Sequence, residues 1–167
     1  SACLPYADAQ RIGMYTEPLN HAALEFNIDT PKRVAPWLAQ IAHESGSLRY
    51  VLELADGKAY EGRRDLGNVQ AGDGPRFKGR GLLQVTGRAN YAACGRALNR
   101  NLIEDPSYLE TPMGAARSAA WFWYHKGLND AADAERFWTI SKVINGGTNG
   151  LDDRIQHYCR IRKVLGL

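Results

Sequence analysis

Apolar residues recur at helical spacing between Thr30 and Gly46. One face of a helix drawn over this stretch is apolar at positions i, i+3, i+4, i+7 and i+8, which are Val34, Trp37, Leu38, Ile41 and Ala42. Thr30 followed by Pro31 is a typical helix start, because threonine caps free N–H groups and proline fits the first helical position. Gly46 is a typical stop. The pattern predicts an amphipathic helix over Thr30–Ser45.

The same periodicity predicts further helices around a glycine-rich middle. The first thirty residues indicate two short helices, the second at His21–Asn27 after a cap at Asn20. Later helices are expected at Ala89–Asn99, from Thr111-Pro112 to His125, at Ala134–Ile144 and at Leu151–Leu165. Between residues 48 and 86, glycines separate short extended pieces at 50–54 and 82–86, which predicts a loop-rich lobe or a small antiparallel sheet. With no repeat or linker, residues 1–167 are expected to form one mainly α-helical domain.

Composition and charge exclude several classes of protein. The 167 residues are 44% hydrophobic and 23% charged, as in globular proteins. The longest stretch without Asp, Glu, Lys or Arg is residues 34–43, whereas a membrane span needs about 20 apolar residues, so we do not expect an integral membrane protein. The net charge of +3 is mixed along the chain and gives no concentrated basic stripe for nucleic acid.

The sequence offers little for metal or thiol chemistry. The three cysteines are widely separated, which argues against a disulfide framework or a zinc cluster, and the two in helical patterns, Cys94 and Cys159, are expected in the core. No HExxH motif occurs, and no Cys or carboxylate stands at a ligand spacing from the four histidines, which are His21, His43, His125 and His157. We therefore expect no metal and no cofactor.

Two glutamates near the end of the predicted helix are candidates for acid–base chemistry. At Glu44, the negative end of the helix dipole and the apolar face around Trp37 and Ile41 both disfavour a charged carboxylate, which suits a general acid. Glu53 follows nine residues later in an extended segment, and the turn between them can set the two carboxyls across a groove. Glycoside hydrolysis uses such a pair, an acid for the leaving oxygen and a base for water. Glu61 is an alternative second carboxylate.

Four blocks of sequence follow one another in a distinctive order. Residues 39–46 read AQIAHESG, residues 77–91 read FKGRGLLQVTGRANY, residues 120–123 read AWFW, and residues 143–147 read VINGG, followed by Asp153 and Arg154. Together they resemble the family 19 glycoside hydrolases, the chitinase group that also includes many phage endolysins. The resemblance spans about residues 35–165 and implies a bilobed, lysozyme-like helical fold with a cleft between the lobes.

This resemblance implies roles for individual residues. Glu44 would be the general acid and Glu53 the general base, with Glu61 as the fallback. Thr86 stands where chitinases commonly have a serine that helps to hold the attacking water. Arg154 matches an arginine near the base, where a cation would keep Glu53 ionised. Polar residues that match the family's sugar cleft are Gln84, Asn90 and Asn145. Aromatic faces for sugars are offered by Tyr60, Tyr91 or Trp121, the last also being a candidate for the core. The family implies inversion at the anomeric carbon, which calls for carboxyls about 6.5–9.5 Å apart.

The connection between the extended segment and the second block resembles that of the endolysins. It reads YEGR at 60–63, DLGN at 65–68 and GDG at 72–74, and it lacks the long loops and disulfides of plant chitinases. This favours peptidoglycan over chitin, and implies a monomeric enzyme that acts in the bacterial periplasm or cell wall, encoded by a phage and released from the host cytoplasm. The alternatives are a chitinase acting on N-acetylglucosamine polymers and a non-catalytic glycan-binding module, against which the presence of both glutamates argues.

Overall fold

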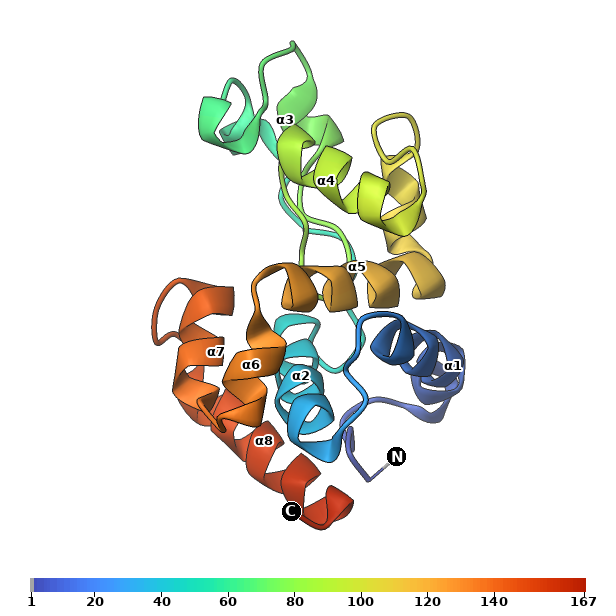
Figure 1. Cartoon of the computed structure of the whole chain (residues 1–167). Coiled ribbons are helices and arrows are strands. Elements are labelled where there is room, and N and C mark those ends of the chain that lie inside the picture. Colours follow the sequence, from blue (N-terminus) through green and yellow to red (C-terminus); the bar gives the residue numbers. More distant parts are fainter. Residues whose placement is uncertain (1) are drawn as a thin grey trace.

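The predicted amphipathic helix is α2 (Pro31–Glu44), which lies in the middle of the larger lobe (Figure 1). The computed structural model describes residues 2–167. Thr30 caps α2 by accepting a hydrogen bond from a backbone N–H, and Trp37 and Ile41 are buried on the apolar face. The helix α8 (Leu151–Leu165) has its predicted bounds and packs along α2. This packing brings residues about 110 positions apart in the sequence into direct contact.

The helix α1 (Ala9–Glu25) is continuous, so the prediction of two short helices in this region is wrong. Asp8 caps it, and Asn20, which was expected to be a cap, lies in its interior. Pro18 lies within the helix and lacks an N–H donor. One face of α1 is nevertheless buried against α5 (Pro112–His125), and this packing stabilises the helix through the proline.

Two short helices follow α5 in the larger lobe. They are α6 (Leu128–Asp133), which the sequence pattern did not reveal, and α7 (Phe137–Asn145). The helix expected at Ala134–Ile144 begins three residues later, because residues 134–136 form a turn in which Glu135 adopts a left-handed backbone with φ of 53°.

The smaller lobe consists of short helices and turns, with no sheet among residues 2–167. Its elements are η1 (Lys58–Tyr60), η2 (Arg64–Leu66), α3 (Asp73–Arg76), α4 (Arg88–Leu98) and η3 (Pro106–Glu110). Isolated antiparallel bridges join Leu52 to Arg80 and Arg80 to Val85. Gly81, with φ of 92°, leaves the extended conformation beside these bridges, so the pairing does not grow into strands. The loop-rich alternative is therefore confirmed and the small sheet is not.

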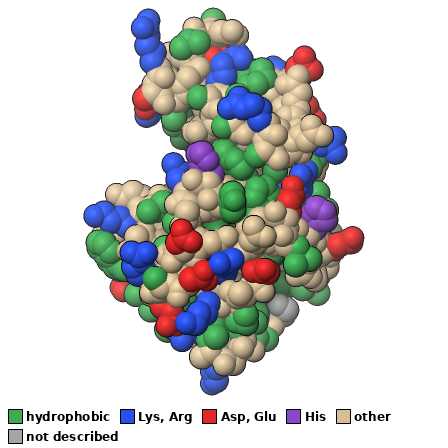
Figure 2. Space-filling model, viewed as in Figure 1, with side chains coloured by type: hydrophobic (Ala, Val, Ile, Leu, Met, Phe, Trp, Pro, Cys, Tyr) green, Lys and Arg blue, Asp and Glu red, His purple; other side chains and the backbone are tan. Residues whose placement is uncertain are grey.

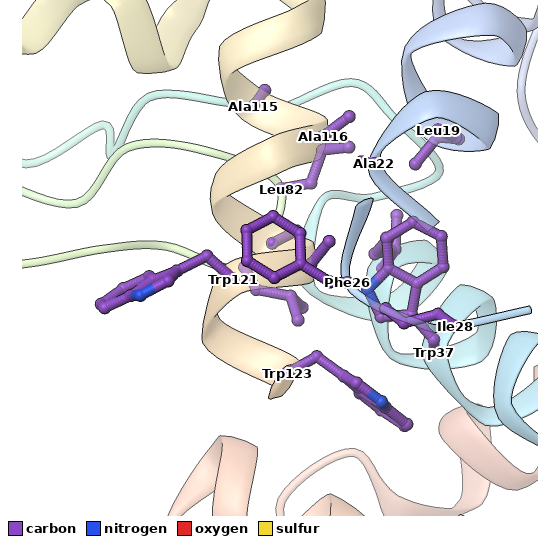
Figure 3. Close-up of a cluster of buried hydrophobic side chains, with 14 of the residues drawn as sticks. Leu19, Ala22, Phe26, Ile28, Trp37, Leu82, Ala115, Ala116, Trp121 and Trp123 are labelled. Carbon is purple, nitrogen blue, oxygen red and sulfur yellow. The ribbon is translucent and has the colours of Figure 1, made fainter. Parts of the chain in front are cut away.

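The core of the larger lobe gathers side chains from α1, α2 and α5 (Figure 3). Phe26, Ile28 and Trp37 pack in this cluster near alanines of α5, whose small side chains let neighbouring elements approach closely. Trp123 is fully buried and its Nε1 donates to Oδ1 of Asn129 at 2.9 Å. Trp121 is 6% exposed and belongs to the same buried cluster, so its expected place in the core is confirmed; its ring points away from Phe26 and Trp37 in Figure 3.

Two further expectations concern the cysteines and membranes. Cys94 is buried as expected, whereas Cys159 is exposed and the expectation that it lies in the core is wrong, because its side of α8 faces solvent. Within residues 2–167, none of the helices combines the length and the apolar character that crossing a membrane requires.

Candidate active site

The carboxylate of Glu44, at the end of α2, is paired with the guanidinium of Arg154 near the start of α8. Nη2 of Arg154 donates to Oε1 of Glu44 at 2.5 Å. Nη1 of Arg154 donates to Oε1 of Gln40, and Nε2 of Gln40 donates to Oγ of Ser141 at 2.8 Å. The Arg154 side chain is 2% exposed and that of Glu44 is 28% exposed. The guanidinium is thus held from inside the lobe, while the carboxylate remains accessible from the surface.

This ion pair corrects the position expected for Arg154. The arginine was expected beside the base Glu53, but it lies on Glu44 because α8 packs along α2. A neighbouring cation favours the charged form of a carboxylate. It therefore opposes the helix dipole and the apolar neighbours that were expected to disfavour the charge of Glu44.

A tight turn carries the chain from α2 towards Glu53. Three successive residues, Gly46, Ser47 and Leu48, have positive φ values of 55°, 59° and 68°. Oγ of Ser45 accepts a hydrogen bond from the N–H of Leu48 at 2.8 Å, which closes the turn. The chain then runs as an extended segment towards the smaller lobe (Figure 1).

Both carboxylate oxygens of Glu53 accept hydrogen bonds from neutral donors. The hydroxyl of Tyr60 donates to Oε1 and the backbone N–H of Gly79 donates to Oε2, each at 2.9 Å. The N–H of Glu53 donates to the carbonyl of Gly79 at 2.9 Å, so side chain and backbone bind the same glycine. Hydrogen bonds to the charged form of a carboxylate favour that form. This is the environment that a general base needs.

Gly79 also brings Gln84 close to Glu53. A Cβ at position 79 would lie 2.4 Å from Oε1 of Gln84 and 3.1 Å from Oε2 of Glu53. Only glycine leaves room for both side chains here, and Gln84 is thereby held beside the second carboxylate. Gln84, which was expected to line the sugar cleft, stays a candidate for sugar binding.

Glu61, the alternative second carboxylate, binds the backbone of the smaller lobe. Its Oε1 accepts from the N–H of Gly72 at 2.7 Å, and its Oε2 accepts from the N–H of Gly74 at 2.8 Å. These bonds fasten the turn after η1 to the start of α3. Both oxygens of Glu53 also accept hydrogen bonds, so Glu53 stays the candidate for the second carboxylate and Glu61 the alternative.

A small pocket that includes Gln84 is lined by several of the residues expected to bind sugar. It has a volume of about 60 Å³ and is lined by Gln84, Val85, Thr86, Asn90, Trp121, Phe122, His125 and Lys126. Trp121 stacks on His125 with ring centroids 5.3 Å apart. Figure 2 shows the molecular surface hollowed between the two lobes.

Other expected sugar-binding residues have different surroundings. Tyr91 is fully buried, donates to the carbonyl of Lys78 at 2.6 Å and accepts from Nη1 of Arg80 at 3.1 Å. Burial raises the pKa of Tyr91 to about 12. Its expected stacking on a sugar is wrong, because no face of the ring is accessible. Asn145 is partly exposed and its Nδ2 donates to the carbonyl of Asn149 at 3.1 Å, so it closes the loop after α7 and stays a candidate.

The structure adds two residues that the sequence analysis missed. Gln40 supports Arg154, and Gly79 supports Glu53. Gln40 lies three residues after Trp37 and is fully buried. A polar residue on the apolar face of an amphipathic helix was the signal that marked it. Gly79 stands in the most characteristic block of the sequence, but its contacts depend on a fold that periodicity does not reveal.

Comparisons with known proteins show which family the chain belongs to. Residues 25–167 match the family model described as Chitinase class I. The chain is 35% identical over 106 residues to a family 19 glycosyl hydrolase domain-containing protein of Haemophilus influenzae, covering 64% of this chain and 51% of that protein. It is 33% identical over 167 residues to an endochitinase of Arabidopsis thaliana, covering 93% and 58%. The chain therefore spans about half the length of the curated relatives it matches.

Solved structures show the same fold. A bacterial family 19 chitinase superposes with a TM-score of 0.78 at 22% identity, covering 97% of this chain and 95% of that one. Chitinase C from Streptomyces griseus gives 0.72 at 23% identity, covering 98% and 77%. The mainly helical, lysozyme-like fold that the sequence implied is confirmed by these neighbours. With the family model matching most of its length, the chain belongs to glycoside hydrolase family 19.

Proposed function

We propose that this chain hydrolyses β-1,4 bonds in glycans of N-acetylated aminosugars, with Glu44 as the general acid and Glu53 as the general base. One observation carries the proposal. Two carboxylates in different surroundings, one beside a guanidinium and one held by neutral donors, flank the turn and extended segment that join the lobes. A pair of carboxylates with distinct environments is what glycoside hydrolysis requires.

The proposed reaction is a single displacement. Glu53 takes a proton from a water molecule as that water attacks the anomeric carbon, and Glu44 gives its proton to the leaving glycosidic oxygen. The new bond forms on the face opposite the one that breaks, so the configuration inverts. The donors from Tyr60 and Gly79 keep Glu53 oriented, and the Thr86 hydroxyl is proposed to hold the water. Arg154 stabilises the Glu44 carboxylate after the transfer, and the partial exposure of Glu44 lets solvent return the proton.

Two polymers fit this chemistry. The short connection through η1, η2 and α3 resembles that of endolysins and favours peptidoglycan, which would be cut in the bacterial periplasm or cell wall. The Arabidopsis relative is an endochitinase and both solved structures are chitinases, which favours chitin. Both polymers have a β-1,4-linked backbone containing N-acetylglucosamine, so the same carboxylates serve either one. Turnover of chitin oligomers and of purified peptidoglycan, measured side by side, assigns the substrate.

The acid assignment is tested with Glu44→Gln. This variant keeps the size of the side chain but has no proton to give, so hydrolysis of the preferred glycan should fall by about a thousandfold or more. Glu17→Gln, an exposed glutamate on α1, is the matched control and should keep full activity. Unimpaired hydrolysis by Glu44→Gln contradicts the assignment. Glycan binding without hydrolysis by the unaltered chain would instead indicate a binding module.

The products test the rest of the proposal. Proton NMR of fresh products should show the α-anomer first, because inversion of a β-linkage gives it directly. An initial β-anomer would contradict the single displacement. Mass spectrometry of the reducing ends released from peptidoglycan shows which of its two alternating sugars carries the new reducing end. This identifies which β-1,4 bond is cut.

A further inference from the structure

Two neighbouring pairs of residues join α2 to α8 at the candidate acid. Glu44 binds Arg154, and the preceding residue on each helix forms a second pair, in which Nδ1 of His43 donates to Oδ2 of Asp153 at 2.6 Å. The same carboxylate oxygen lies 3.5 Å from Nε2 of His157, one helical turn further along α8. Asp153 therefore stands between a histidine of each helix and directly before the arginine that holds Glu44.

His43 is also tightly enclosed by the start of α8. A Cβ at Gly150, the N-cap of α8, would lie 2.3 Å from Cε1 and 2.4 Å from Nε2 of the His43 ring. The ring is thus pressed against the backbone of Gly150 while it binds Asp153. A change in the position of His43 would move the first turn of α8, on which Arg154 lies.

His157 lies near the same oxygen of Asp153 that His43 binds, and approaches it from α8. Its side chain is 5% exposed and, among residues 2–167, its buried Nδ1 has no hydrogen-bond partner. Burial lowers the pKa of His157 from its ordinary value of 6.5; Asp153 raises it, and the charges of Arg160 and His43 lower it further. The edge of the ring also faces Tyr6, with centroids 6.0 Å apart.

We propose that Asp153 is a positioning residue, which binds His43 and His157 and thereby holds Arg154 on the Glu44 carboxylate. The Asp153 side chain is 54% exposed, and surface ion pairs contribute little to stability by themselves. Its effect is instead geometric, because it fixes the first turn of α8 against the last turn of α2. This inference rests on the proposed role of Glu44.

The test compares Asp153→Asn with Asp152→Asn. Both variants remove a negative charge from the first turn of α8, so both lose the same interaction with the helix dipole. Asp153→Asn should lower kcat by about tenfold and leave KM within about twofold, because a small displacement near reacting groups slows chemistry. Asp152→Asn should leave both constants unchanged. His43→Ala should reproduce the loss, and His43→Asn, whose amide can replace Nδ1, should restore most of it.

A stability measurement distinguishes this proposal from the proposed function. Urea unfolding of Glu44→Gln, Asp153→Asn and the double variant should be non-additive, because Asp153 acts on the Glu44–Arg154 pair. Additive effects overturn the positioning role even if the chain hydrolyses glycans. Non-additive effects in a chain without hydrolytic activity support the positioning role and reject the proposed function.

Discussion

The hydroxyl of Tyr60 donates a hydrogen bond to Oε1 of Glu53 at 2.9 Å, opposite the N–H of Gly79 on Oε2. Burial and the adjacent Glu53 carboxylate raise the pKa of Tyr60, so the hydroxyl remains a donor at neutral pH. The carbonyl of Tyr60 in turn accepts from Nδ2 of Asn68 at 2.8 Å, which anchors the tyrosine to the smaller lobe. The orientation of the Glu53 carboxylate therefore depends on a tyrosine that is itself anchored in the smaller lobe.

Removing that hydroxyl should weaken the base. We expect Tyr60→Phe to lower kcat by about three- to tenfold, because one of the two bonds that orient Glu53 is lost. Tyr50→Phe, at an exposed tyrosine, is the control. A fall in substrate affinity at constant kcat would show that Tyr60 contacts the sugar instead.

The two donor nitrogens of the Arg154 guanidinium, Nη1 and Nη2, matter more than its charge. Lysine at this position keeps the cation but cannot bind Glu44 and Gln40 together. We expect Arg154→Lys to lower kcat by about tenfold or more and the free energy of unfolding by about 1–2 kcal/mol, since a buried hydrogen bond is lost. Arg160→Lys, on the same helix, should change neither quantity appreciably. Wild-type kcat in Arg154→Lys would contradict a role for the guanidinium geometry.

The parts of the fold that the sequence predicted depend on local signals. The helices α2 and α5 have their expected starts because a threonine cap and a following proline act within four residues. In α1, burial against α5 overrode the cap expected at Asn20, and the helix continues through Pro18. The turn at Glu135 has no comparable signal, because a left-handed glutamate is held there by its neighbours rather than by its own preference.

The candidate site also has one part that the sequence predicted and one part that it did not. Residue types and spacing indicated Glu44 and Glu53 as candidates, because acid–base chemistry needs carboxylates. The sequence did not indicate which residue pairs with each carboxylate, because Arg154 reaches Glu44 only through the packing of α8 on α2. Glu61 has the same carboxylate chemistry, and its hydrogen bonds from the N–H groups of Gly72 and Gly74 were not indicated by the sequence either. Partners such as these follow from tertiary contacts that no local pattern encodes.

Two glycines near the acid should differ in their tolerance of alanine. Gly146 and Gly150 both have positive φ, at 72° and 68°, so alanine costs about 1 kcal/mol of stability at either. Space around Gly146 is open, whereas a Cβ at Gly150 collides with the His43 ring. Gly150→Ala should therefore cost about 2–3 kcal/mol in total. Thermal unfolding of the two variants measures the difference, and equal losses would show that His43 moves aside freely.

The buried carboxylate of Asp73 should make the stability of the chain depend on pH. Its side chain is 2% exposed, Arg88 donates to both of its oxygens, and the N–H groups of Val69 and Gln70 donate to Oδ2 at 3.0 Å each. The hydrogen bonds from Arg88 are the largest cause that lowers the pKa of Asp73 from its ordinary value of 3.8. Because the folded value lies below the unfolded one, the unfolded chain binds more protons as the solution becomes acidic.

The contribution of Asp73 is therefore complete above about pH 5 and is lost as the pH falls through 3.8 and below, towards the folded value. Asp73→Asn should lower the free energy of unfolding by about 2–3 kcal/mol at pH 7, because Arg88 loses its charged partner. The deficit should shrink as the pH is lowered from about 5 to 3. Urea unfolding at successive pH values checks this, with Asp152→Asn as the control for loss of a carboxylate in α8. A deficit that stays constant over this range would mean that Asp73 stabilises the smaller lobe by shape rather than by charge.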